Sequence, residues 1–218
     1  MAYTPLTDAE FNALPGLDDW RVLLGGSIHA TFAVDSYPRA AALLLAITEA
    51  AERADHHPNL DLRYPGRVHV VLTTHSLGGL TSRDAEVARE FSALASTHHA
   101  TAETAGAQEL ALALDTVNAD AIRPFWAAVL DYREVAGDLV DPRGEGPFLW
   151  FQEMDPARTE RGRFHLDVGV AHDQARARLD AALAAGGRLV TDSFAPSWWV
   201  LADAEGNEAC LCTWQGRD

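Results

Sequence analysis

The chain has 218 residues, of which 48% are hydrophobic and 22% charged, and its formal net charge at pH 7 is −15. No apolar run approaches the about 20 residues that a membrane span requires, and so acidic a chain lacks the basic face that nucleic-acid binding uses. The opening residues do not have the basic and apolar regions of a signal peptide. Two cysteines, Cys210 and Cys212, are too few for a disulfide framework and are expected to be buried thiols. These features predict a soluble, cytoplasmic protein with neither a membrane nor a nucleic-acid partner.

The first hundred residues predict three helices separated by two pairs of strands. Thr7 and Glu10 have the spacing of a capping box, which marks the start of the first helix. Pro58 disfavours the helical conformation at His57, so the second helix should end near His56. The expected elements in chain order are a helix at 6–14, strands at 18–24 and 27–34, a helix at 36–56, strands at 60–64 and 67–74, and a helix at 81–96.

Strand pairs joined by helices are typical of an α+β fold, in which an antiparallel sheet carries its helices on one face. We assign this first domain to residues 1–100. Residues 101–108 are small and polar and have no apolar periodicity, so they are interpreted as a linker. The second domain is then residues 109–218.

A faint internal repeat organises the second domain. Residues 109–135 contain a strand, a loop, a helix and the start of another strand, and residues 164–190 repeat that layout. Each copy continues with strand-like segments, and in the second copy Gly206-Asn207 predicts a turn. The repeat therefore predicts paired βαβββ modules.

Three histidines raise the question of function. His56 and His57 come at the predicted end of a helix, and His75 comes where a predicted strand ends. Glu52 precedes His56 by four residues, so on a regular helix the two are neighbours and the carboxylate would orient the ring. Three interpretations are open: exposed histidines without a role, a three-histidine metal site, and general acid–base catalysis, to which the ordinary pKa of imidazole, about 6.5, is suited.

These residues belong to a longer pattern that resembles the signature of the pterin-4a-carbinolamine dehydratase family. The pattern consists of Glu52, His56-His57-Pro58, Tyr64, Thr74-His75, Gly79-Leu80-Thr81 and Asp84, and the resemblance covers about residues 6–100. It implies a four-stranded antiparallel sheet with helices on one face. It also implies a lyase that removes water from 4a-hydroxytetrahydropterin (4a-hydroxytetrahydrobiopterin) to give quinonoid dihydropterin, requires no cofactor, and self-associates as a dimer or tetramer.

The resemblance also implies a role for each residue of the pattern. His56 and His75 would form the acid–base pair, His57 would bind and polarise the pterin ring, and Glu52 would tune His56. Contacts with the substrate would come from Asp55, Pro58, Tyr64, Thr74 and Asp84. A non-catalytic alternative is a protein that binds pterin, or acts as a dimerisation cofactor, without turnover.

Some positions of the first domain have a second interpretation. Thr81 and Asp84 also have the spacing of a capping box, so helix capping is an alternative role for Asp84. Leu60 stands where many members of the family carry an aromatic residue. The span from Tyr64 to His75 is one residue longer than is usual in the family, and the turn between the two strands can absorb that residue.

The second domain resembles the glyoxalase and bleomycin-resistance group of the vicinal oxygen chelate (VOC) superfamily. The resemblance rests on the repeat, on Phe125-Trp126 in the first helix, and on Asp203, Gly206-Asn207 and Glu208 in the last hairpin. It covers about residues 109–214. Because this fold hosts many activities, the resemblance alone names no ligand.

Metal-dependent VOC members take their ligands from the first and last strand of each unit. The resemblance places these positions at Ala111, Gln152, His165 and Cys210, and of these only His165 is a clear ligand for a hard divalent cation. We therefore expect no metal, and a pocket lined by Gln152, His165, Trp198 and Glu208, together with Trp150, Phe151 and Trp199. The alternatives are a nonstandard metal set of His165, Gln152 and Glu208, and a VOC-type isomerase or dioxygenase as the main activity.

Overall fold

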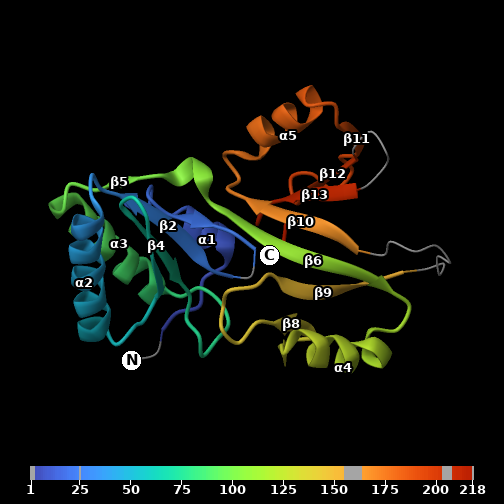
Figure 1. The fold of residues 1–218 in the computed structure, drawn as a ribbon, viewed down its shortest axis with the longest axis horizontal. Coiled ribbons are helices and arrows are strands. Elements are labelled where there is room, and N and C mark those ends of the chain that lie inside the picture. Colours follow the sequence, from blue (N-terminus) through green and yellow to red (C-terminus); the bar gives the residue numbers. More distant parts are fainter. Residues whose placement is uncertain (1–2, 25, 155–163, 203–207, 218) are drawn as a thin grey trace. The chain divides into compact units, whose positions relative to one another are not determined.

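The computed structural model describes residues 3–24, 26–154, 164–202 and 208–217. Contacts between residues divide the chain into two compact units (Figure 1). Unit 1 comprises Met1–Ala107, Ala171–Gln174 and Thr213–Asp218, and unit 2 comprises Gln108–Val170 and Ala175–Cys212. Within the described ranges, no helix is both long and apolar enough to cross a bilayer.

Unit 1 contains three α-helices, α1 (Asp8–Asn12), α2 (Tyr37–Ala54) and α3 (Ser82–Thr97). Both predicted capping boxes are present: the Thr7 N–H donates to Glu10 at 2.9 Å, and the Thr81 N–H donates to Asp84 at 2.8 Å. These reciprocal bonds satisfy backbone donors that a helix start would otherwise leave without partners. The three helices predicted from the sequence are confirmed.

The sheet of unit 1 is antiparallel throughout. Its strands are β1 (Arg21–Val22), β2 (Ile28–Ala33), β3 (Asn59–Arg63), β4 (Arg67–Leu72) and β5 (Thr101–Ala102). The order is β1-β2-β4-β3, and β5 pairs with the last two residues of β2, Phe32 and Ala33. The segment interpreted as a linker thus adds a fifth strand to the expected four, and a short 3-10 helix, Thr104–Gly106, follows it.

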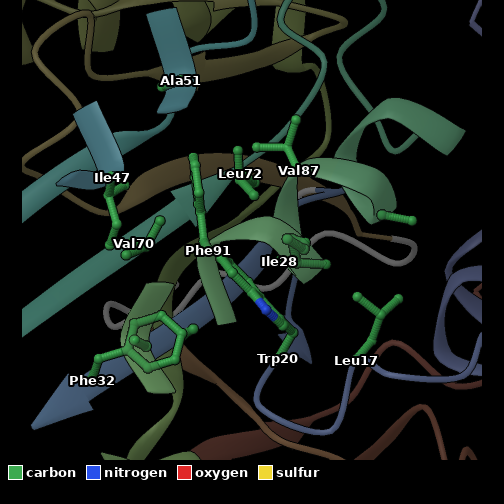
Figure 2. Close-up of a cluster of buried hydrophobic side chains, with 14 of the residues drawn as sticks. Leu17, Trp20, Ile28, Phe32, Ile47, Ala51, Val70, Leu72, Val87 and Phe91 are labelled. Atoms are coloured by element: carbon green, nitrogen blue, oxygen red, sulfur yellow. The ribbon is translucent and has the colours of Figure 1, made fainter. Parts of the chain in front are cut away.

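The core of unit 1 lies between this sheet and the helices. Val68, Val70 and Leu72 alternate along β4 and are each 0% exposed, because successive residues of a strand point to opposite faces. The side chains in Figure 2 come from the sheet and from both long helices: Ile28 and Phe32 from β2, Ile47 and Ala51 from α2, and Val87 and Phe91 from α3. This packing anchors the end of α2 and the start of α3.

Unit 2 has the predicted paired βαβββ modules. The first is β6 (Gln108–Thr116), α4 (Ala119–Leu130), β7 (Arg133–Val135), β8 (Asp138–Val140) and β9 (Phe148–Glu153). The second is β10 (Phe164–Val170), α5 (Ala175–Ala184), β11 (Arg188–Thr191), β12 (Trp198–Ala202) and β13 (Glu208–Cys212). The eight strands form one sheet in the order β11-β12-β13-β10-β6-β9-β8-β7. The turn predicted at Gly206-Asn207, with Asp203, lies outside the described residues.

The alternation of side chains along the strands gives this sheet two different faces. Phe151 packs with Leu114 and Leu149 against α4, and Trp199 packs in a cluster that includes Leu179 of α5. Phe151 and Trp199, which were expected to line a pocket, therefore belong to the helix-covered face. The side chains at the alternate positions of β6, β9, β10, β12 and β13 point to the opposite face of the sheet. They include Asp115, Trp150, Gln152, His165, Asp167, Trp198 and Cys210.

Candidate functional site

Two of the histidines lie directly after α2. Asp55 adopts a left-handed backbone conformation (φ 48°), and the His56 N–H donates to the Ala51 carbonyl at 3.1 Å, which closes the helix end. The helix was predicted to reach about His56 and ends at Ala54, because Asp55 leaves the helical conformation. Aspartate adopts the left-handed conformation more readily than most residues. This reversal takes His56 and His57 out of the helical repeat.

His56 is buried and paired with Asp84. Its Nε2 lies 2.7 Å from Asp84 Oδ1, and the two side chains are 8% and 0% exposed. The other oxygen of Asp84 accepts hydrogen bonds from the Thr74 hydroxyl at 2.7 Å and from the Thr81 N–H at 2.8 Å. Burial would raise the pKa of Asp84, but the hydrogen bonds from His56, Thr74 and Thr81 outweigh it and hold that pKa below its ordinary value. Asp84 is therefore the ionised acceptor of the His56 Nε2–H.

Glu52 contacts a different histidine from the one expected. Its Oε2 lies 3.0 Å from His57 Nε2, whereas the Nε2 of His56 bonds to Asp84. The four-residue spacing of Glu52 and His56 makes them neighbours only on a continuous helix, and the left-handed Asp55 ends that continuity. Glu52 and His57 are 80% and 57% exposed, so this contact lies in water.

His75 brings the end of β4 to the end of α2. Its Nε2 lies 3.4 Å from the backbone oxygen of His57. The loop that carries His75 is closed where the Thr74 N–H donates to the Gly79 carbonyl at 3.0 Å, and Gly78 takes a positive φ of 63°, which favours glycine. Both His57 and His75 are exposed, so a small molecule can reach them.

The structure therefore brings together six of the residues singled out from the sequence: Glu52, His56, His57, Thr74, His75 and Asp84. Asp55 is exposed at the helix end, and Pro58 is half-buried beside His57. Tyr64 is not brought to this cluster. Its ring lies 6.5 Å from that of Tyr37 at the start of α2, and an 18-residue helix rises about 27 Å between its two ends.

In unit 2, two of the predicted pocket residues are in contact, since His165 Nε2 lies 3.0 Å from Gln152 Oε1. The negative charge of Glu208 contributes to raising the pKa of His165. Trp198 stacks on Phe194, with ring centroids 4.5 Å apart and planes inclined by 13°.

Two buried carboxylates beside His165 were missed from the sequence. Asp115 Oδ1 lies 3.7 Å from His165 Nε2, and Asp167 Oδ1 lies 3.3 Å from His165 Nδ1. The contact with Asp167 raises the pKa of His165, burial lowers it, and the charges of Asp167, Asp115 and Glu208 add to the increase. The two-residue spacing of His165 and Asp167 on a predicted strand was the available signal, because it puts both side chains on one face.

Unit 1 is thus a small α+β domain whose buried polar residues form a histidine–aspartate centre. Residues 4–94 match the family model described as pterin 4 alpha carbinolamine dehydratase. A relative from Nocardia farcinica (strain IFM 10152), named "Putative pterin-4-alpha-carbinolamine dehydratase", is 47% identical over 83 residues, which are 38% of this chain and 85% of the relative. The chain belongs to the pterin-4a-carbinolamine dehydratase family.

Further similarities cover each half of the chain. A crystal structure titled as a transcriptional coactivator/pterin dehydratase from Brucella melitensis is 35% identical and covers 42% of this chain and 99% of that one, with a TM-score of 0.39. Residues 111–212 match the family model described as a glyoxalase-like domain. A glyoxalase/bleomycin resistance protein/dioxygenase superfamily member from Vibrio splendidus 12B01 is 11% identical over 49% of this chain and 99% of its own, with a TM-score of 0.32. Both resemblances predicted from the sequence are confirmed by the family models.

Proposed function

We propose that unit 1 dehydrates a 4a-hydroxytetrahydropterin, such as 4a-hydroxytetrahydrobiopterin, to the quinonoid dihydropterin by histidine acid–base chemistry. The observation that carries this proposal is the buried hydrogen bond between His56 and Asp84, with His75 against the backbone of His57. Membership of the family supports the class of substrate. A carboxylate that orients a histidine is a recurrent arrangement for a general base.

The reaction needs one proton donor and one proton acceptor. The C4a–O bond breaks with its electron pair on oxygen, and the oxygen takes a proton to leave as water. The N5 lone pair forms the N5=C4a double bond at the same time. The resulting cation then loses a proton and becomes the neutral quinonoid dihydropterin. Two imidazoles, one protonated and one neutral, serve both needs near neutral pH.

We assign the donor role to His75 and the acceptor role to His56. Because Asp84 is ionised and holds the Nε2–H of His56, Nδ1 of this ring is the free base. The same carboxylate stabilises the imidazolium that forms when His56 takes up a proton. His57, which is exposed and bonded to Glu52, is assigned to the pterin ring.

Stopped-flow absorbance with chemically generated 4a-hydroxytetrahydropterin tests the proposal. The unaltered full-length chain is expected to accelerate formation of the quinonoid dihydropterin over the spontaneous reaction. Binding of pterin without acceleration would overturn the proposal and favour the alternative of a non-catalytic pterin-binding protein or dimerisation cofactor.

Glu52→Gln is expected to reduce the dehydration rate by about fivefold at most. The contact with His57 lies in water, and an exposed ion pair of this kind contributes about 0–1 kcal/mol. Asp84→Asn makes the same change from carboxylate to amide at a buried position and is the matched comparison. If Glu52→Gln slowed the stopped-flow reaction more than Asp84→Asn did, the assignment of Asp84 to the acceptor histidine would be wrong.

The proposed chemistry uses no cofactor, since neither proton transfer moves electrons to or from an external group. Self-association as a dimer or tetramer stays a prediction.

A further inference from the structure

We propose that His165, Asp167 and Cys210 in unit 2 form a binding site for one zinc ion. One ligand atom from each residue lies within 4.8 Å of the other two. The strand pairing explains this convergence, because Asp167 of β10 and Cys210 of β13 are direct partners in the parallel pair, and His165 precedes Asp167 by two residues on the same face.

The separations of the ligand atoms suit a tetrahedral ion. With Zn–N and Zn–O bonds of about 2.0–2.2 Å and a Zn–S bond of about 2.3 Å, tetrahedral geometry puts neighbouring ligand atoms about 3.3–3.7 Å apart. Asp167 Oδ1 lies 3.3 Å from His165 Nδ1, and Cys210 Sγ lies 3.8 Å from the same nitrogen. The third separation, between the ligand atoms of Asp167 and Cys210, is within 4.8 Å, so binding one ion would draw these two atoms together.

The atoms that face away from the cluster are already held in place. The Nε2 of His165 lies 3.0 Å from Gln152 Oε1, which can accept its proton, so a zinc ion would take the place of the Nδ1 proton that faces Asp167. The Trp150 indole N–H donates to Asp167 Oδ2 at 2.9 Å, which leaves Oδ1 toward the cluster. Oδ1 of Asp167 is buried and lies 3.3 Å from His165 Nδ1, in the position of a ligand atom. Such outer partners orient the ligands of metal sites.

The ligand set indicates which metal fits. A thiolate together with imidazole and carboxylate favours zinc over magnesium or calcium, which prefer oxygen ligands only. Three protein ligands leave a fourth position open to water or to a substrate. The carboxylate of Asp167 is buried beside the His165 imidazole, so a divalent cation between them would keep its negative charge compensated.

This set differs from the one that the VOC resemblance implies. Ala111 at the first ligand position offers no donor, and Cys210 at the last position does not suit a hard divalent cation, and both were reasons to expect no metal. Asp167 is the antiparallel partner of Ala111 in β6, so it lies in the same row of the sheet and supplies the missing oxygen ligand.

Metal titration of the full-length, tag-free chain tests the site without any assay of activity. After removal of metal with a chelator, the chain is expected to take up one equivalent of Zn²⁺ in competition with a chromophoric chelator. With Co²⁺ as the probe, it should develop the intense near-ultraviolet band of a cobalt–thiolate bond. Gln152→Ala is expected to weaken zinc binding by about 10- to 100-fold, because it removes only an outer partner of His165.

Cys210→Ser should abolish the cobalt–thiolate band and weaken zinc binding by more than Gln152→Ala does. Cys212→Ser is the matched control, since it makes the same change two residues further along β13 and should leave both the band and the affinity unchanged. The site is overturned if the unaltered chain takes up no equivalent of zinc, if the band persists in Cys210→Ser, or if the band is lost only in Cys212→Ser. Circular dichroism of each variant identifies any that fail to fold.

Discussion

His75→Ala is expected to slow the dehydration of 4a-hydroxytetrahydropterin by about 100- to 10,000-fold, the usual loss when a general acid or base is removed. The His75 ring is exposed, and its described hydrogen bond is the 3.4 Å contact with the backbone oxygen of His57. Removing it should therefore change the free energy of unfolding by no more than about 0.5 kcal/mol. Stopped-flow absorbance at saturating substrate would measure the loss as a change in the chemical step.

His98→Ala provides the control for this variant. His98 caps the C-terminal end of α3, whereas the candidate site lies at the N-terminal end of that helix, beside Thr81. The control should turn over substrate at the rate of the unaltered chain. If His75→Ala did the same, His75 would not be the proton donor, and the acid–base assignment would have to be abandoned.

Asp84→Ala is expected to lower the free energy of unfolding of unit 1 by about 3–5 kcal/mol, because each buried polar group that loses its hydrogen-bond partner costs about 1–3 kcal/mol. The variant would leave the imidazole of His56, the hydroxyl of Thr74 and the N–H of Thr81 without their acceptor. It would also remove half of the capping box of α3. Because the chain has two units, urea unfolding should be combined with amide hydrogen exchange in α3, which reports on unit 1 alone.

The capping box of α1 offers a matched control. Glu10 makes the same kind of bond to the Thr7 N–H, but in an exposed position, so Glu10→Ala should cost about 1 kcal/mol or less. Equal losses in the two variants would mean that the buried contacts of Asp84 add nothing to its role as a cap.

The contribution of Asp84 to stability should also depend on pH. Its pKa is lower in the folded chain than in the unfolded one, so between the two values the unfolded chain binds more protons. The stabilisation is therefore complete above the ordinary pKa of about 4 and is lost as the pH falls through the lower pKa of the folded state. The difference in unfolding free energy between the unaltered chain and Asp84→Asn should accordingly shrink below about pH 4.

Most of the secondary structure could be predicted because its signals are local. The capping boxes at Thr7 and Thr81 fixed two helix starts, and the repeat in the second half predicted the order of its strands and helices. The end of α2 was misplaced by about two residues, because Asp55 adopts a conformation that more often belongs to glycine. The strand β5 was missed because two small residues, Thr101 and Ala102, carry no apolar pattern.

The candidate site was predictable in its members and less so in its contacts. The convergence of His56, His57 and His75 followed from a helix end and a strand end, and the pattern of residues pointed to both. The pairing of His56 with Asp84 joins residues 28 positions apart, which only the packing of α3 against the sheet brings together. Spacing along a helix therefore connected Glu52 to the wrong histidine.

The fifth strand of unit 1 bears on where the chain can be cut. Arg67 binds Glu103, just after β5, through bonds of 2.6 and 2.8 Å, and β5 covers the backbone of Phe32 and Ala33. A fragment truncated at Ala100 would lose both features and expose the edge of β2 at Phe32 and Ala33. Exposed strand edges promote aggregation. A recombinant fragment of the first half should therefore retain the residues through Ala107, so that β5 stays paired with the edge of β2.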